Sequence, residues 1–150
     1  MVTLSVFGYL YVDGPVLARF LCCAFFAVLF LQSGFDKVAD WKGNLEWLTG
    51  HFSKSPFKGV VPILLGVLTA FELASGVLSL AAFVIGFFSS AREPVALAFT
   101  MCGLTLVMLF TGQRLAKDYP GAAVLAAYFA VALLGLMTVG VVVDAPPAIG

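Results

Sequence analysis

The sequence predicts an all-α integral membrane protein: a four-helix bundle with a short interfacial amphipathic helix between the first and second spans. Composition is the first observation behind this prediction, because 62% of the 150 residues are hydrophobic, 11% are charged and the mean hydropathy is +1.09. An ordinary soluble domain is about 25% charged. The second observation is that apolar residues gather in runs of about 20, the length that crosses a ~30 Å hydrocarbon core as a helix. We expect all 150 residues to form one domain.

Four apolar runs place the spans at approximately residues 15–35, 60–88, 94–112 and 120–143. Each begins at or near a proline, which suits a first helical turn because its missing N–H would lack a partner there anyway: Pro15, Pro62, Pro94 and Pro120. The stretch Leu4–Val12 precedes the first span, and we expect it to be an interfacial or docked segment. We expect no cleaved signal peptide, since the first 14 residues carry no Lys or Arg.

The three connections between spans differ in kind. Ser89–Glu93 and Gln113–Tyr119 are short, which predicts that the second, third and fourth spans are sequential antiparallel neighbours. Phe35–Gly59 is longer and more polar, and its large apolar residues recur at helical spacing: Trp41, Leu45, Leu48 and Phe52. This pattern predicts a short amphipathic helix around Asp40–Phe52 in the headgroup region, where Trp is favoured.

Basic residues predict the orientation in the membrane. Four spans bring both termini to one face, whose loops carry only Arg19 and Arg92. Six basic residues occupy the two loops of the other face: Lys37, Lys42, Lys54, Lys58, Arg114 and Lys117. Because cytoplasmic loops are enriched in Lys and Arg, we expect residues 35–59 and 113–119 in the cytoplasm and the termini outside.

Glu72 is the most informative single residue, because it lies near the middle of the apolar run Val60–Phe88. A carboxylate in a span costs about 2.5–3.5 kcal/mol on insertion scales, so it usually faces the bundle interior and has a partner. Two stripes of polar or small side chains are expected to face each other. One is Thr69, Glu72, Gly76 and Ser79, and the other is Arg19, Cys23, Phe26, Phe30, Ser33 and Lys37.

Lys37 is the expected partner of Glu72, and Arg114 the second choice, since both lie near the membrane face from which the second span starts. Arg19 approaches from the opposite face. Without a cation in reach, burial would keep Glu72 protonated. Two interpretations of Glu72 stay open: an interhelical contact that stabilises the bundle, or a carboxylate that handles protons or contacts a ligand.

The remaining polar residues are weaker candidates. Gln113 and Arg114 follow the third span, either as an interfacial anchor or as ligand contacts. His51 is the only histidine. A lone histidine in such a loop is more often solvated than catalytic. The three cysteines form no CxxC pair and no metal-ligand spacing, and are expected to pack as small apolar residues: Cys22, Cys23 and Cys102.

Arg19 is followed in the first span by residues 30–37, FLQSGFDK, which end in SGxxK. This combination resembles the first helix of the DoxX family of bacterial membrane proteins. Residues 65–76, LGVLTAFELASG, resemble its second helix, where a Glu precedes small residues. Residues 112–123, GQRLAKDYPGAA, are similar to a motif of some bacterial DoxX-like members. The resemblance covers roughly residues 16–136 and implies a four-helix membrane bundle.

The resemblance also implies a redox setting, because the family takes its name from a subunit of a thiosulfate:quinone oxidoreductase and other members are linked to thiol or oxidative stress. Related four-helix redox proteins use a CxxC pair, which this chain lacks, so we do not expect it to be a disulfide-forming enzyme by itself. No haem or iron–sulfur ligand set is present either. At most, therefore, the chain is expected to be one subunit of a quinone-linked oxidoreductase.

These observations favour a quinone-linked membrane subunit of the bacterial inner membrane, with no intrinsic cofactor and quinone as the candidate external one. Glu72 would accept or relay a proton, and a quinone oxygen or an anionic substrate would be bound by Arg19, Lys37, Arg114 and Gln113. The alternative is a structural or assembly subunit with no chemistry of its own, and a small transporter ranks third. The expected partners are the bilayer and other membrane subunits or a second copy; zero net charge gives no reason to expect nucleic acid.

Overall fold

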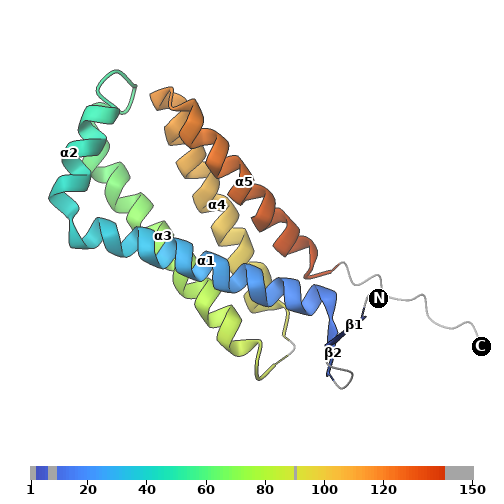
Figure 1. The fold of residues 1–150 in the computed structure, drawn as a ribbon. Helices are drawn as coiled ribbons and strands as arrows, with labels where there is room; N and C mark the ends of the chain where they lie inside the picture. The colour runs from blue at the N-terminus through green and yellow to red at the C-terminus, as the bar shows by residue number, and fades with distance from the viewer. Residues whose placement is uncertain (1–2, 7–9, 90, 141–150) are drawn as a thin grey trace, which may run out of the picture.

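The computed structural model describes residues 3–6, 10–89 and 91–140, and its body is a bundle of helices (Figure 1). In chain order the elements are β1 (Thr3–Val6), β2 (Leu10–Asp13), α1 (Gly14–Ala39), α2 (Trp41–His51), α3 (Val61–Ile85), α4 (Glu93–Ala116) and α5 (Tyr119–Met137). Four of these helices, α1, α3, α4 and α5, are long and apolar enough to cross a membrane. The predicted four-helix bundle with a short helix after its first span is confirmed.

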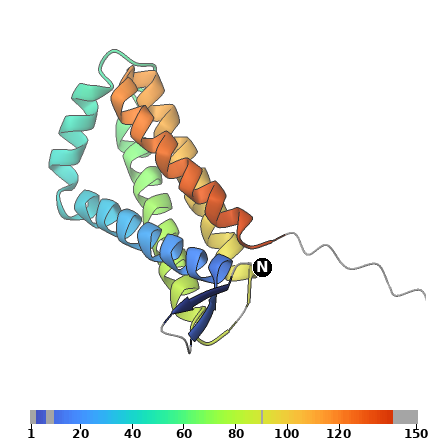
Figure 2. The ribbon, with the colours of Figure 1, turned by 45° about the vertical axis from the view of Figure 1, so that its right-hand side comes forward.

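Successive long helices pack against one another, α1 on α3, α3 on α4 and α4 on α5. Figures 1 and 2 show α3, α4 and α5 side by side, with α1 running across α3. The N-terminal hairpin and the end of α5 lie at the same end of the bundle, whereas α2 lies at the other end. The antiparallel order of the last three spans is therefore as predicted, while the orientation across a membrane stays a prediction.

Two helices extend past the glycines at which they were expected to end. α1 continues beyond Gly34 to Ala39. The glycine serves close packing instead of ending the helix, since a Cβ there would lie 2.5 Å from Leu73 Cδ2. α4 continues past Gly112 to Ala116 and ends where Lys117 adopts the left-handed conformation, at φ 63°. α5 ends at Met137, and residues 141–143 of its predicted span lie outside the described residues.

The segment before α1 forms a hairpin. β1 pairs antiparallel with β2, with Thr3 opposite Asp13 and Val6 opposite Leu10. The sequence analysis expected only an interfacial or docked segment here, and residues 7–9 lie outside the described part of the chain. β-Branched and aromatic residues are frequent in both strands, which is typical of β-structure.

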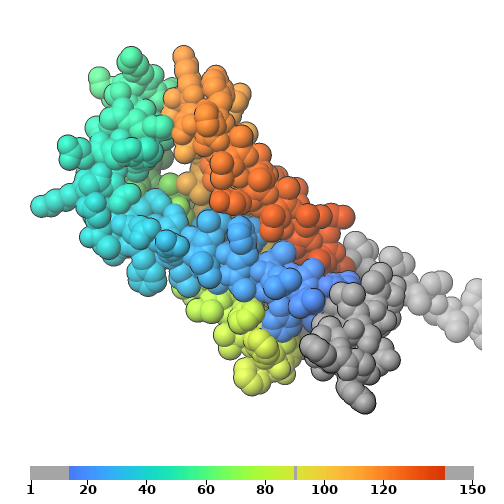
Figure 3. Space-filling model, in the orientation of Figure 1, coloured from blue at the N-terminus to red at the C-terminus, as the bar shows by residue number. Residues whose placement is uncertain are grey.

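The core of the bundle is aromatic and its outer surface is apolar. Buried Phe26 and Phe30 of α1 pack with Phe99 of α4, beside the two buried cysteines Cys23 and Cys102. Large apolar side chains are exposed on every long helix. Figure 3 shows the face of the bundle on which α1 and α5 lie side by side. An apolar exterior on helices of spanning length is what contact with a lipid bilayer requires.

The register of α1 on α3 positions the rest of the molecule. Gly76 packs on Leu31 and Gly34 packs on Leu73, so the level of Ala39, the last residue of α1, corresponds to about Leu68 on α3. The first seven residues of α3 therefore extend about 10 Å beyond α1. α2 occupies this space: it runs back alongside the start of α3, and Trp41 lies next to Gly66 (Figure 2).

Candidate functional site

The buried carboxylate of Glu72 is the centre of a three-residue cluster between α1 and α3. Its side chain is 1% exposed, and Lys37 Nζ lies 2.9 Å from Oε2 and donates to Oε1 at 3.0 Å. Ser33 Oγ donates to the same Oε1 at 2.9 Å and accepts from Lys37 Nζ at 2.8 Å. Lys37 is therefore the partner that the sequence analysis ranked first.

The α1–α3 register explains why the lysine reaches the carboxylate. Ser33 and Lys37 are four residues apart and share one face of α1, which meets α3 at the level of Glu72. Glu72 Oε2 lies close to the ammonium but receives no hydrogen bond of good geometry. Since the lysine side chain is only 16% exposed, the cluster is almost closed to solvent. It can stabilise the contact between α1 and α3.

Beyond Glu72, the polar face of α3 turns toward α4. Ser75 Oγ and Thr105 Oγ1 are 2.8 Å apart, and Ser79 Oγ lies 3.3 Å from Cys102 Sγ. All four side chains are buried. The prediction that Ser79 faces the first span is therefore wrong, and the contact between Ser75 and Thr105 was not predicted. Ser75 could have been predicted, because it lies three residues after Glu72 and four before Ser79 and therefore belongs to the same helical stripe.

A second candidate site is a pocket of about 320 Å³ between α2, α3 and α4. Most of its lining is apolar, from Leu48 on α2, Leu65 and Leu68 on α3 and Val107 on α4, among others. Its polar edge is a pair: His51 Nε2 lies 3.3 Å from Gln113 Oε1. The pocket forms where α2 replaces α1 beside the start of α3.

The imidazole of His51 is held in place by its neighbours. The ring of Trp47 stacks on it, with centroids 4.7 Å apart and an interplanar angle of 14°. Phe52 meets its edge at 5.2 Å. His51 is not among the predicted site residues, because a lone histidine in a loop is usually solvated. Its position four residues after Trp47 on one helix was the clue.

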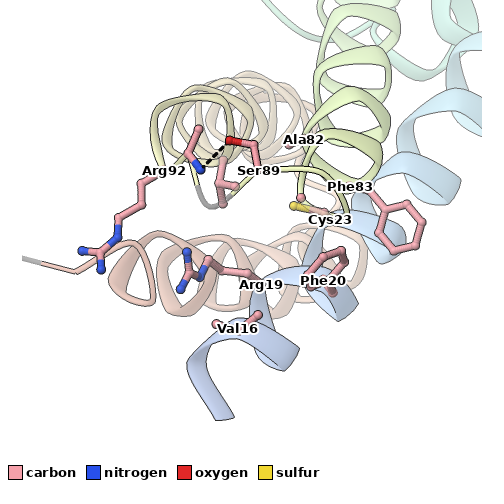
Figure 4. A pocket seen from close by; sticks show the side chains of 11 residues that line it. Val16, Arg19, Phe20, Cys23, Ala82, Phe83, Ser89 and Arg92 are labelled. Atoms are coloured by element: carbon pink, nitrogen blue, oxygen red, sulfur yellow. Dashed lines mark hydrogen bonds between the residues drawn. The ribbon is translucent and has the colours of Figure 1, made fainter. Parts of the chain in front are cut away.

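The residues predicted to form one site are divided among separate places. Lys37 and Glu72 are together. Gln113 lines the pocket between α2, α3 and α4, which we call the pocket beneath α2. Arg114 is exposed, with its guanidinium carbon 4.7 Å from the centre of the Tyr119 ring, which fits the anchor interpretation. Arg19 lies near the opposite end of the bundle, beside a different cavity (Figure 4). The structure therefore does not bring these five residues together in one place.

Glu72 and the pocket beneath α2 are close along α3 but distinct. Leu68 at the inner wall of the pocket precedes Glu72 by four residues, about one helical turn, while the carboxylate itself faces α1. Among the residues that the structure describes, no group of three His, Cys, Asp or Glu side chains converges to bind a metal ion. The chain matches no known family model, no curated protein and no solved structure.

Proposed function

We propose that this protein is a quinone-linked, DoxX-like membrane subunit whose quinone site is the pocket beneath α2. The observation that carries the proposal is the combination of apolar walls with the His51–Gln113 pair at one edge. Small-molecule sites have volumes of about 300–1,000 Å³ and consist of apolar surface with a few placed polar groups. A neutral ring with two carbonyl oxygens needs the same combination, apolar walls and one or two hydrogen-bond donors.

The pair can supply those donors. His51 and Gln113 contact each other, and which atom donates depends on the tautomer of the histidine. When the pair opens, the imidazole N–H and the amide NH₂ can each donate to a carbonyl oxygen. Trp47 fixes the plane of the imidazole, so His51 is oriented before a ligand enters.

A bound quinone would accept two electrons and two protons. The electrons must come from another subunit with a redox cofactor, because this chain has no ligand set for haem or iron–sulfur clusters. His51 is the group in the pocket that can donate a proton at a carbonyl oxygen. Glu72 is the candidate for proton resupply: it follows Leu68 of the pocket wall by one helical turn on α3, with its carboxylate on the α1 side, and it also stabilises the end of α1.

The motif residues support the DoxX-like part of the proposal. Ser33 and Lys37 belong to the SGxxK ending of the first segment and Glu72 to the second segment, and the three side chains form one hydrogen-bonded cluster. The bacterial inner membrane and a partner subunit are proposed on the same resemblance. A contact between motif residues that are far apart in sequence is what a shared structural role would require.

Quinone binding to the purified protein tests the proposal. We expect decylubiquinone or a short-chain menaquinone to quench Trp47 fluorescence saturably in detergent. Gln113→Leu and His51→Phe each remove a donor, and Phe keeps a ring to stack on Trp47. Each should weaken binding about tenfold, the effect of one lost hydrogen bond of about 1.4 kcal/mol. Lys58→Gln, an exposed position outside the pocket, is the matched control.

Two results would count against this function. Saturable quenching with the same Kd in the parent and both pocket variants would move the quinone site elsewhere. Absence of any quinone binding, with a stoichiometric membrane protein copurifying in mild detergent, would favour the alternative of a structural or assembly subunit. The apolar exterior and the nearly closed Glu72 cluster are the observations that favour that alternative.

A further inference from the structure

A separate cavity of about 270 Å³ lies near the end of the bundle opposite α2. It is formed by the start of α1, the end of α3 and the start of α4, and its polar lining includes Arg19, Ser89 and Arg92 (Figure 4). Figure 4 shows the two arginine side chains on one side of the cavity and the rings of Phe20 and Phe83 on the other. The cavity thus has a cationic wall and an aromatic wall.

The two guanidinium groups have unused donors. Arg19 Nε donates to the carbonyl oxygen of Pro15 at 3.3 Å, and Arg92 Nη1 donates to that of Val139 at 3.4 Å. Each guanidinium has five N–H donors. Among residues 14–89 and 91–140, whose side chains the structure describes, the one ion pair is Lys37–Glu72, and no acidic residue lines this cavity. Two positive charges therefore border a cavity with no acidic side chain from this part of the chain in its lining.

Ser89 adds a third donor. Its Oγ accepts a hydrogen bond from the backbone N–H of Ala91 at 3.1 Å, so the hydroxyl hydrogen is free to donate to a ligand. Guanidinium forks match the geometry of phosphate oxygens and bind them in pairs. A carboxylate offers only two oxygens, whereas a phosphate offers enough acceptors for both arginines and the serine together.

The aromatic wall continues out of the cavity onto the surface. Phe87 packs on Phe20 at 4.9 Å and on Phe83 at 5.1 Å, measured between ring centroids, and is 66% exposed. An apolar surface that borders a cationic cavity suits a ligand with a charged head and a hydrocarbon chain. A free anion would use only the cationic wall.

We propose that this cavity binds a phosphate group between Arg19 and Arg92, carried by an anionic lipid or present as free phosphate. The site is independent of the quinone pocket, which lies at the other end of α3 and shares no residue with it. The phosphate oxygens accept hydrogen bonds from both guanidinium groups and from Ser89. When the phosphate belongs to a lipid, an acyl chain packs along Phe20 and Phe87.

The test compares the parent with Arg19→Gln, Arg92→Gln and the double variant. Native mass spectrometry of the detergent-purified protein measures adducts with phosphatidylglycerol and with diacylglycerol of the same acyl chains, which lacks the phosphate. Calorimetric titration with inorganic phosphate measures the free anion. Lys58→Gln removes a cation far from the cavity and is the matched control.

If a lipid headgroup occupies the site, the parent retains phosphatidylglycerol over diacylglycerol, and each single variant loses about tenfold in affinity. If free phosphate occupies it, phosphate binds the parent and competes with the lipid, and both effects disappear in the arginine variants. The two single variants keep the test valid if the double variant does not fold. Equal phosphatidylglycerol retention by the parent and both single variants, without phosphate binding, would overturn the proposal.

Discussion

Glu72 is a buried carboxylate whose charge is balanced by a single ammonium group, and the two partners are not equivalent. Lys37 is 16% exposed and can turn toward water if its partner is lost, whereas Glu72 is 1% exposed and cannot. Breaking a buried pair is destabilising by about 3–5 kcal/mol when it leaves an uncompensated charge. The cost should therefore depend on which of the two residues is replaced.

We predict that Lys37→Met destabilises the protein by about 3–5 kcal/mol. Glu72→Gln should melt close to the parent, because the amide oxygen can still accept from Ser33 and the lysine can reach solvent. The double variant should recover most of the loss of Lys37→Met, since no unpaired carboxylate remains. Thermal unfolding of the four proteins in detergent measures this cycle.

The same Glu72→Gln protein separates the two roles of the carboxylate. A folded variant that retains quinone binding and partner association assigns Glu72 a structural role. A folded variant that binds quinone but loses quinone-linked turnover in its complex assigns it proton transfer. If Lys37→Met melts like the parent, the ion pair contributes nothing to the stability of the protein, and the predicted role of Lys37 is wrong.

At the scale of helices, close approach between α1 and α3 sets the register that brings Lys37 to Glu72. Gly76 lets the two backbones meet: a Cβ there would lie 2.8 Å from the backbone nitrogen of Leu31 and 2.8 Å from Leu31 Cγ. A backbone atom cannot move aside as a side chain can. Small residues at such crossings are typical of helix packing in membranes.

Gly76→Ala should therefore destabilise the bundle by about 1–3 kcal/mol, the usual cost of overpacking. Gly50→Ala on α2 is the matched control, because a Cβ there meets nothing within 4 Å and alanine is the better helix former. Unfolding in detergent should rank Gly50→Ala at or above the parent and Gly76→Ala below it. If Gly76→Ala is as stable as the parent, the close approach of α1 and α3 at Gly76 does not contribute to stability.

At the scale of the whole molecule, the charged residues of α1 indicate where the two boundaries of the hydrocarbon layer lie. The 16 residues Phe20–Phe35 of α1 carry no charge and rise about 24 Å, close to the ~30 Å of a hydrocarbon core. Asp36 and Lys37 follow at one end, and Arg19 precedes at the other. Through the α1–α3 register, Glu72 lies near the first boundary, although it is central in its own apolar run.

We predict that Val67 lies at the membrane boundary and Val77 within the hydrocarbon layer; both are exposed positions of α3. Single-cysteine variants with spin labels, made after replacing the native cysteines, report depth by electron paramagnetic resonance. The label at position 77 should collide with oxygen, and the label at 67 with a polar nickel chelate. If the two labels lie equally deep in the lipid, this prediction is wrong, and Glu72 lies near the centre of the membrane.

The local pattern of the sequence determined the number of spans, the short helix after the first, and the buried carboxylate with its lysine partner. These features depend on apolar run length, helical period and the cost of a charge in lipid, all of which can be read along the chain. The hairpin Thr3–Asp13 shows the limit, because a short apolar stretch alone does not distinguish a strand from a docked segment.

Only the tertiary structure decided where the candidate residues meet. Gly34 is typical of a helix end in sequence, but here it contacts Leu73 within the helix. α1 extends past Lys37 to Ala39 and still stops short of the level at which α3 starts. That difference in length makes room for α2 and its His51–Gln113 pocket, and it leaves Arg19 at the far cavity. Register and relative helix length arise from contacts between distant segments, and no local period encodes them.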